Sequence, residues 1–328
     1  MENILEVKNL RKNFNVGSNF LQSNKTVFKA VDDISFNIQK GTIMGLVGES
    51  GCGKSTTGKL ILNLIKPSSG KVLFDRKIIY DVENKIEMKN SELRELRRHM
   101  QIIFQDPYSS LDPRKNVEQI IGEGLKKHKL CKKSELKNTI LKYLNKCGLQ
   151  EDSLKKYPHE FSGGQRQRIG IARALSLNPK FIVCDEPTAA LDVSIQSQIL
   201  NLMLELKETY GLTYLFISHN LNIVKNFCDN IGVMYLGTLV EKGETKEIFK
   251  EPLHPYTKAL ISSVPKSHPL EKREKIILKG EIPTASNIPK GCRFNTRCPY
   301  ATEKCQSEEP KLLEIKPKHF VACHLYQE

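Results

Sequence analysis

The chain has 328 residues, of which 39% are hydrophobic and 27% charged, and its formal net charge is +14. This composition is typical of a globular protein, and no apolar run approaches the ~18 residues of a membrane-spanning helix. We expect no signal peptide, because the first residues alternate charged and apolar side chains. The basic residues are scattered along the chain, which argues against nucleic acid as a partner. Any membrane role must therefore depend on other subunits.

Alternating apolar residues predict short strands within residues 1–40, with an exposed loop between Val16 and Thr26. Residues 41–50 (GTIMGLVGES) predict a buried strand that ends in a glycine turn. A helix follows in KSTTGKLILNLI, and we expect the run from Pro67 to Gly70 to end it. Residues 91–100 predict a charged helix capped by its serine, and MQIIFQ predicts a strand after it.

Residues 112–178 are expected to be mainly helical. Beyond them KFIVCDEP predicts a buried strand, SIQSQILNLMLELKETYG a long helix and LTYLFISH a further strand. Strands that alternate with helices predict a parallel α/β sheet, here interrupted by a helical insertion. Prolines become frequent after about residue 250, so we place a domain boundary near Glu251.

A phosphate-binding loop is predicted at residues 48–55, where GESGCGKS fits the pattern GxxxxGK[ST]. Its glycines allow backbone N–H groups to face the phosphates at the start of a helix. Lys54 is expected to reach the β- and γ-phosphates and Ser55 to ligate Mg²⁺. An ordinary glycine turn is the alternative, but the strand–loop–helix context favours phosphate binding.

Two carboxylates end the strand that contains IVCDE. Acidic side chains in so apolar a strand indicate a cation or a reacting water close by. We expect Asp185 to hold Mg²⁺ and Glu186 to polarise the attacking water.

A second helix start offers N–H groups to an anion in the sequence FSGGQRQR, and a plain capped helix is the alternative. One nucleotide needs only one phosphate loop, so this segment is expected to serve a nucleotide bound to another subunit. Its residues in that role are Ser162, Gly163, Gly164 and Gln165.

The ordered set GESGCGKST, FQDPYSSLDP, FSGGQRQRI, IVCDEP, AALD and ISH resembles the ATP-binding cassette of ABC transporters, over about residues 4–250. The resemblance implies an α/β P-loop NTPase (RecA-like) core with an antiparallel β subdomain and a helical insertion at about residues 106–170. The signature departs from the commonest form only at Phe161, where leucine is usual. The ATP-binding residues that it implies are Phe14, Gly48, Glu49, Ser50, Gly51, Cys52, Gly53, Lys54, Ser55 and Thr56.

The resemblance also assigns roles to residues outside the phosphate loop. Phe14 would stack on adenine, and Gln105 would ligate Mg²⁺, sense the γ-phosphate and couple to the transmembrane subunit. Asp192 would contact the opposing cassette. His219 would contact the γ-phosphate and steady Glu186 and its water.

The segments FQDPYSSLDPR, TAALDVSIQ and PLHPYTKALISSVP are similar to the ATPases of oligopeptide/dipeptide importers, a branch that includes nickel importers. Residues 251–328 would be the importer-type extension. The implied partners are a paralogous ATPase in a heterodimer, two permease subunits and an extracytoplasmic solute-binding protein, at the cytoplasmic face of the cell membrane. The loop 16–26 and Tyr108–Ser110 favour the second of two paralogues. Peptide, nickel and another small solute remain open as cargo.

Two rival classes are a soluble ABC ATPase acting on DNA or ribosomes and a regulatory cassette that does not hydrolyse ATP. The first usually carries two cassettes or a long coiled coil, and the sequence shows neither. The second would have a degraded Glu186, His219 or signature, and all three are intact.

Four cysteines crowd the end of the chain with the spacing C-x5-C-x6-C-x17-C. Zinc sites usually contain C-x2-4-C pairs, which this spacing lacks. Four thiolates on a proline-containing loop suit a [4Fe–4S] cluster, and related importer tails are thought to carry one. Unligated or structural cysteines are the alternative. The residues concerned are Cys292, Cys298, Cys305 and Cys323.

Overall fold

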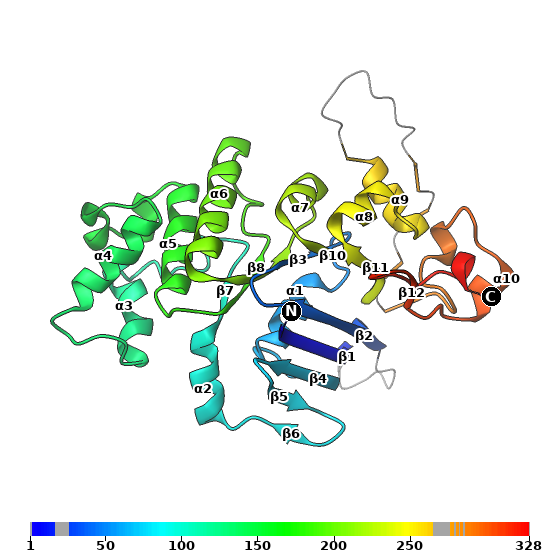
Figure 1. Ribbon diagram of the computed structural model, residues 1–328, viewed down its shortest axis with the longest axis horizontal. Coiled ribbons are helices and arrows are strands. Elements are labelled where there is room, and N and C mark those ends of the chain that lie inside the picture. The colour runs from blue at the N-terminus through cyan, green and yellow to red at the C-terminus, as the bar shows by residue number, and fades with distance from the viewer. Residues whose placement is uncertain are drawn as a thin grey trace. The chain divides into compact units, whose positions relative to one another are not determined.

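The computed structural model describes residues 2–16, 26–264, 276–278, 280–281, 283–284 and 286–327 (Figure 1). The predicted loop between Val16 and Thr26 therefore lies outside the described residues, apart from its two ends. The chain forms two compact units, and each contains segments from distant parts of the sequence. No helix in the described ranges is long and apolar enough to cross a membrane.

The first unit comprises Met1–Glu2, Gln39–Gly41 and Met88–Ile217 and contains three parallel strands. They are β7 (Met100–Ile103), β8 (Phe181–Asp185) and β9 (Thr213–Ile217), side by side in that order. Every residue of β8 and β9 is buried, as expected for parallel strands covered on both faces. The predicted strands are confirmed, and β8 ends on the first of the two carboxylates.

The helices of the first unit are α2 (Asn90–His99), α3 (Val117–Lys127), α4 (Leu136–Lys146), α5 (Gly163–Leu175) and α6 (Val193–Tyr210), with 3₁₀ turns η1 (Glu151–Lys155) and η2 (Pro158–Glu160). Helices α3, α4 and α5 pack against one another, which confirms the helical insertion. The predicted serine cap of α2 is wrong. The N-cap is Lys89, whose carbonyl already accepts the first helical bond from Leu93 N–H, so Ser91 lies inside the first turn.

The second unit comprises Asn3–Ile38, Thr42–Glu87 and Ser218–Glu328 and contains a five-stranded sheet in the order β2-β1-β4-β5-β6. These strands are β1 (Asn3–Val16), β2 (Thr26–Gln39), β4 (Ser69–Phe74), β5 (Lys77–Asp81) and β6 (Ile86–Glu87). Strands β1 and β2 are longer than the short strands that the pattern predicts. The sheet is the antiparallel β subdomain that the family resemblance implies.

The same unit carries a mixed set of strands in the order β12-β13-β11-β10-β3. Their bounds are β3 (Ile43–Val47), β10 (Asn230–Tyr235), β11 (Thr238–Glu244), β12 (Leu313–Lys316) and β13 (His319–Val321). Strand β10 runs parallel to β3, and β11 and β13 are antiparallel to their neighbours. The end of the chain therefore extends the sheet that contains β3.

The helices of the second unit are α1 (Lys54–Ile61), α7 (Leu221–Phe227), α8 (Thr245–Lys250), α9 (Pro255–Ser262) and α10 (Glu303–Ser307), with 3₁₀ turns η3 (Asn295–Arg297) and η4 (His324–Tyr326). The predicted end of the first helix at Pro67–Gly70 is wrong. Helix α1 ends at Ile61 because Asn63 adopts a left-handed conformation with φ 49°, and Ser69 already begins β4.

Candidate nucleotide-binding site

The phosphate loop joins β3 to α1 within the second unit, as the sequence predicts. Gly48, Gly51 and Gly53 have φ values of 151°, 78° and 105°, which side-chain-bearing residues rarely adopt. A Cβ atom at Gly48 would lie 2.2 Å from the carbonyl oxygen of Met234, and one at Gly53 would lie 2.3 Å from that of Ala30. Backbone conformation and close packing both require glycine at these two positions.

Lys54 begins α1 and lies buried against its own loop. Its Nζ donates to the carbonyl oxygens of Gly48 at 2.8 Å and Glu49 at 2.9 Å. The residue before the helix, Gly53, has no side chain to cap the first turn, so the turn can receive an anion. Cys52 is buried in the loop, and this burial raises the pKa of its thiol, an effect that Lys54 only partly opposes.

The carboxylate pair lies in the first unit, at the carboxyl end of β8. Asp185 is buried as the last residue of the strand. Glu186 follows with a left-handed φ of 46°, and its N–H donates to the carbonyl of Ile217 at 3.0 Å. Such backbone strain is often found at functional sites. Gln105 Nε2 donates to Glu186 Oε2 at 3.2 Å, so the structure brings these two predicted residues together.

The signature segment begins α5 with a complete capping box. Ser162 Oγ accepts from the N–H of Gln165 at 3.4 Å, and Gln165 Oε1 accepts from the N–H of Ser162 at 3.0 Å. Gly164 packs closely on Ile195, because an added Cβ would lie 2.5 Å from Ile195 Cγ2. The start of the helix is therefore capped by its own side chains, and Ser162, Gly163 and Gln165 remain exposed.

Three predicted residues lie on exposed surface. Phe14 on β1 is 38% exposed, and the Nζ of Lys12 lies 4.9 Å from its ring centroid. Asp192 precedes α6 in the first unit, and His219 precedes α7 in the second. All three side chains are therefore accessible to a nucleotide or to another subunit.

Sequence reasoning missed two residues that contact the phosphate loop. Tyr256 Oη accepts a hydrogen bond from the N–H of Glu49 at 2.9 Å, and the guanidinium of Arg297 pairs with the Glu49 carboxylate. Tyr256 lies in the segment PLHPYTKAL, and Arg297 directly precedes one of the late cysteines. Since 248 residues separate Glu49 from Arg297, no local spacing could have revealed the pair.

The four late cysteines are free thiols that line one pocket of about 100 Å³, together with His254 and Phe294. Burial raises the pKa of Cys292 to about 12 and that of Cys323 to about 11. Among the residues that the structure describes, no group of three or more His, Cys, Asp or Glu side chains is arranged to hold a metal ion. The donor set suits iron–sulfur chemistry, but the side chains as placed do not form a ligand cage.

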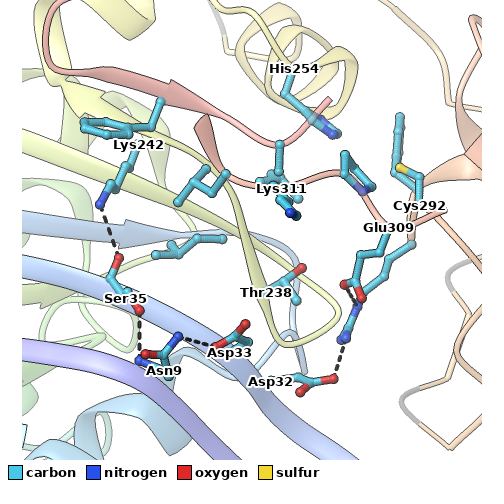
Figure 2. A pocket seen from close by; sticks show the side chains of 18 of the residues that line it. Asn9, Asp32, Asp33, Ser35, Thr238, Lys242, His254, Cys292, Glu309 and Lys311 are labelled. Atoms are coloured by element: carbon cyan, nitrogen blue, oxygen red, sulfur yellow. Dashed lines mark hydrogen bonds and ion pairs between the residues drawn. The ribbon is translucent and has the colours of Figure 1, made fainter. Parts of the chain in front are cut away.

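A larger cavity of about 560 Å³ lies between β1, β2, β11 and the end of the chain (Figure 2). Several of its polar groups bond to one another. Asn9 Nδ2 donates to Asp33 Oδ1 at 2.9 Å, and Lys242 Nζ donates to the carbonyl of Ser35 at 3.3 Å. It contains none of the predicted nucleotide-site residues, and of the four late cysteines only Cys292 lines it.

Comparison with known proteins supports the family resemblance. The ABC transporter family model matches residues 31–189, and the model of the oligopeptide/dipeptide transporter C-terminal region matches residues 240–305. The chain is 49% identical over 327 residues to the oligopeptide transport ATP-binding protein AppF of Bacillus subtilis (strain 168), covering 99% of this chain and 98% of that protein.

Solved structures of ATP-binding cassettes resemble the chain as well. CbiO1 from Clostridium perfringens, part of the ABC transporter complex cbiONQ, is 33% identical with a TM-score of 0.64, covering 76% of this chain and 92% of that chain. A dimeric cassette in a post-hydrolysis state, bound to ADP and Pi, is 28% identical with a TM-score of 0.64, covering 74% of this chain and 98% of that chain. With its phosphate loop, carboxylate pair and signature helix, the chain belongs to the family of ABC transporter ATP-binding proteins and is an ABC ATPase.

Proposed function

We propose that residues 48–56 bind the phosphates of MgATP and that Glu186 acts in its hydrolysis. The glycine loop that closes around Lys54 at the start of α1 carries this proposal, because it presents N–H groups and a buried ammonium to an anion. Ser55, Gln105 and Asp185 would hold Mg²⁺ in this proposal, and the ion would supply positive charge to the β- and γ-phosphates. Phe14 stacks on the adenine.

Glu186 accepts the proton of the attacking water in this proposal. The hydrogen bond from Gln105 Nε2 to Glu186 Oε2 supports this role, because it holds the carboxylate next to a second residue of the predicted site. His219 would contact the γ-phosphate, as the family resemblance implies. Glu186→Gln preserves the shape of the side chain and removes its basicity, so we expect turnover to fall about 10²–10⁴-fold.

The test measures MgATP binding, ATP turnover and thermal stability of Glu186→Gln in the assembled complex. We expect binding and stability to be retained and an ATP-trapped dimer to accumulate. Near-normal turnover would exclude Glu186 as the base. Loss of binding together with turnover would instead indicate a structural role.

We further propose that two cassettes bind ATP head to tail, in a heterodimer with a paralogous ATPase. Ser162, Gly163, Gly164, Gln165 and Asp192 then contact the nucleotide on the partner's phosphate loop. The capped, exposed start of α5 supports this role, and the similar ADP-bound cassette is a dimer. Gln105 and residues 106–160 would receive the coupling helices of the permease.

The cargo that the comparisons favour is a peptide. The match to the oligopeptide/dipeptide transporter C-terminal region and the name of the Bacillus subtilis relative support it. We propose that the chain works at the cytoplasmic face of the cell membrane on two permease subunits, which receive cargo from a solute-binding protein. Reconstitution in proteoliposomes with these partners tests the proposal. ATPase stimulation by peptide-loaded binding protein is expected, whereas stimulation by nickel or another small solute alone would replace the peptide.

We propose that Cys292, Cys298, Cys305 and Cys323 hold a [4Fe–4S] cluster. The support is that all four thiols line one small pocket and that thiolates are the ligands of such clusters. Anaerobically purified protein should contain iron and sulfide and absorb in the blue part of the visible spectrum. Cys298→Ser should remove these signals, while Cys131→Ser should leave them unchanged. Stoichiometric zinc without iron would contradict the proposal.

A further inference from the structure

Glu49, the second residue of the phosphate loop, is held by the C-terminal part of the chain at both its backbone and its side chain. The Nη1 and Nη2 atoms of Arg297 donate to the two carboxylate oxygens of Glu49 at 2.8 and 3.1 Å. Tyr256 Oη accepts from the Glu49 N–H at 2.9 Å. A bidentate pair fixes orientation as well as distance, so the carboxylate is held in one place.

The pair is largely shielded from water. The Arg297 side chain is 7% exposed and that of Glu49 is 23% exposed. Tyr235, Tyr256 and Phe294 form an aromatic cluster beside it, with ring centroids 4.7 to 5.5 Å apart. Tyr235 Oη also accepts a hydrogen bond from Arg297 Nη1 at 3.4 Å. Arg297 thus reaches Glu49 from a packed and rigid surrounding.

A carboxylate in a loop that receives a triphosphate would repel its ligand unless its charge is neutralised. Coulomb interactions are several times stronger in partly buried surroundings than in water, so an unpaired Glu49 would act on the phosphates. Arg297 supplies the compensating positive charge and holds the Glu49 carboxylate beside the C-terminal part of the chain. Tyr256 fixes the backbone of the same residue.

We propose that Arg297 and Tyr256 are positioning residues of the nucleotide site, which neutralise and fix Glu49 so that the phosphate loop accepts nucleotide. The inference rests on the proposed binding of MgATP by this loop. It gives the importer-type extension a role in nucleotide affinity that is separate from any metal bound by the cysteines.

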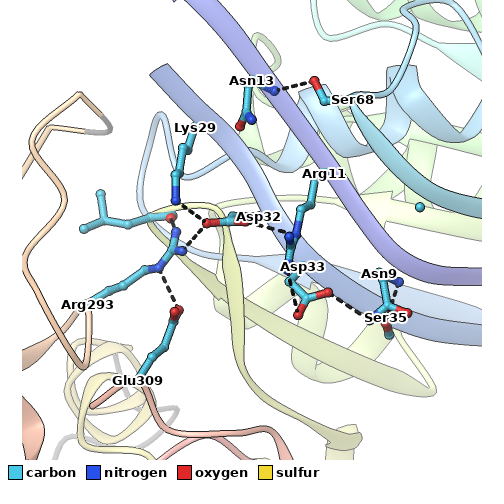
Figure 3. Close-up of polar contacts among 12 residues, drawn as sticks. Asn9, Arg11, Asn13, Lys29, Asp32, Asp33, Ser35, Ser68, Arg293 and Glu309 are labelled. Atoms are coloured by element: carbon cyan, nitrogen blue, oxygen red, sulfur yellow. Dashed lines mark hydrogen bonds and ion pairs between the residues drawn. The ribbon is translucent and has the colours of Figure 1, made fainter. Parts of the chain in front are cut away.

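A matched control lies four residues earlier in the same segment. Arg293 is as deeply buried as Arg297, but it pairs with Asp32 of β2 at 2.5 Å and donates to the carbonyl of Leu236 at 2.6 Å (Figure 3). It also pairs with Glu309 at 3.1 Å. Removing either arginine breaks a buried ion pair between the extension and the rest of the unit, but only Arg297 touches the phosphate loop.

The experiment titrates MgADP into the full-length chain by calorimetry. We expect Arg297→Gln to raise the Kd about tenfold or more, the lower end of the range for a hydrogen bond to a charged group. The double variant Glu49→Gln/Arg297→Gln should regain most of this affinity, because it removes the repelling carboxylate. Arg293→Gln should bind like the wild type. In the transport complex the change should fall on the KM for ATP rather than on kcat.

Arg297→Lys and Tyr256→Phe keep the test decisive if Arg297→Gln folds poorly. The lysine retains the charge and should restore part of the affinity, and the phenylalanine should weaken binding by removing the acceptor of the Glu49 N–H. The inference would be overturned if Arg297→Gln bound MgADP with wild-type affinity, if the two arginine variants lost affinity equally, or if the double variant recovered no affinity. Each of these outcomes would leave the proposed function standing. A wild-type chain that fails to bind MgADP would refute the proposed function and this inference with it.

Discussion

Glu241 on β11 is a fully buried carboxylate that ties the extension to the rest of its unit. It accepts hydrogen bonds from the N–H groups of Leu253 at 2.8 Å and His254 at 2.9 Å, and His319 Nε2 lies 2.7 Å from it. Its side chain is 0% exposed. Glu241→Ala leaves these three donors without their acceptor in a site that water does not reach. Removing one member of a buried charged network costs about 3–5 kcal/mol.

We expect this lost free energy to appear as local opening of β13 and of the chain around Leu253. Hydrogen exchange reports it at the amide of Ala322, which donates to the carbonyl of Val240 at 2.8 Å across the β11–β13 pair. A loss of ~3 kcal/mol should speed exchange there by more than about 100-fold. The chain has no tryptophan, so an intrinsic tryptophan signal is not available for this measurement.

Glu244→Ala is the control, because Glu244 also lies on β11 and also pairs with the turn before β13. Its partner Lys318 lies at 3.1 Å, and the two side chains are 49% and 77% exposed. Exposed pairs contribute about 0–1 kcal/mol, so exchange at Ala322 should change less than tenfold. Equal effects of the two variants would refute the reasoning that burial sets the energy of the Glu241 network.

Three further predictions concern other parts of the chain. Ser162→Arg should block hydrolysis at the partner's phosphate loop and leave ATP binding at Lys54 intact; loss of nucleotide at Lys54 with turnover at the partner's site would exclude the head-to-tail arrangement. Gly53→Ala should abolish MgADP binding and destabilise the chain by about 1–3 kcal/mol, because residue 53 has a left-handed backbone conformation. Gly170→Ala in α5 is the control and should be neutral or stabilising. Thermal unfolding and calorimetry compare the two variants. Burial raises the pKa of Asp32, but Arg293 and Lys29 outweigh it and hold the pKa below its ordinary value. The stability that Asp32 contributes is therefore present above pH ~4 and is lost as the pH falls through the folded pKa, so urea midpoints between pH 6 and 3 should fall less in Asp32→Asn than in the wild type.

The sequence predicts those parts of the structure that depend on neighbouring residues. The phosphate loop, β8 with its two carboxylates and the helix after the signature each follow from a continuous pattern of glycines, apolar runs and caps. The end of α1 was less predictable because Asn63 adopts its left-handed conformation before the chain reaches Pro67. Residues 69–87 have no strong periodicity, and the resemblance alone implied their antiparallel sheet.

Contacts between distant segments could not be predicted in this way. Glu49 fits the phosphate-loop pattern at a position that any residue can occupy, and nothing near it indicates that an arginine will pair with it. Glu241 likewise looks like an ordinary polar residue of an edge strand until β13 covers it. In both cases burial depends on a segment from the end of the chain, which local propensity does not specify.

The pairing of Glu49 with Arg297 has a consequence for synthesis of the protein. A growing chain exposes the phosphate loop early, and its compensating arginine leaves the ribosome 248 residues later. Domains fold as they emerge, N-terminal parts first. The Glu49 carboxylate therefore lacks its compensating charge until the extension has been made and has docked. If Arg297 neutralises Glu49 as proposed, the loop acquires its full affinity for nucleotide only when translation is almost complete.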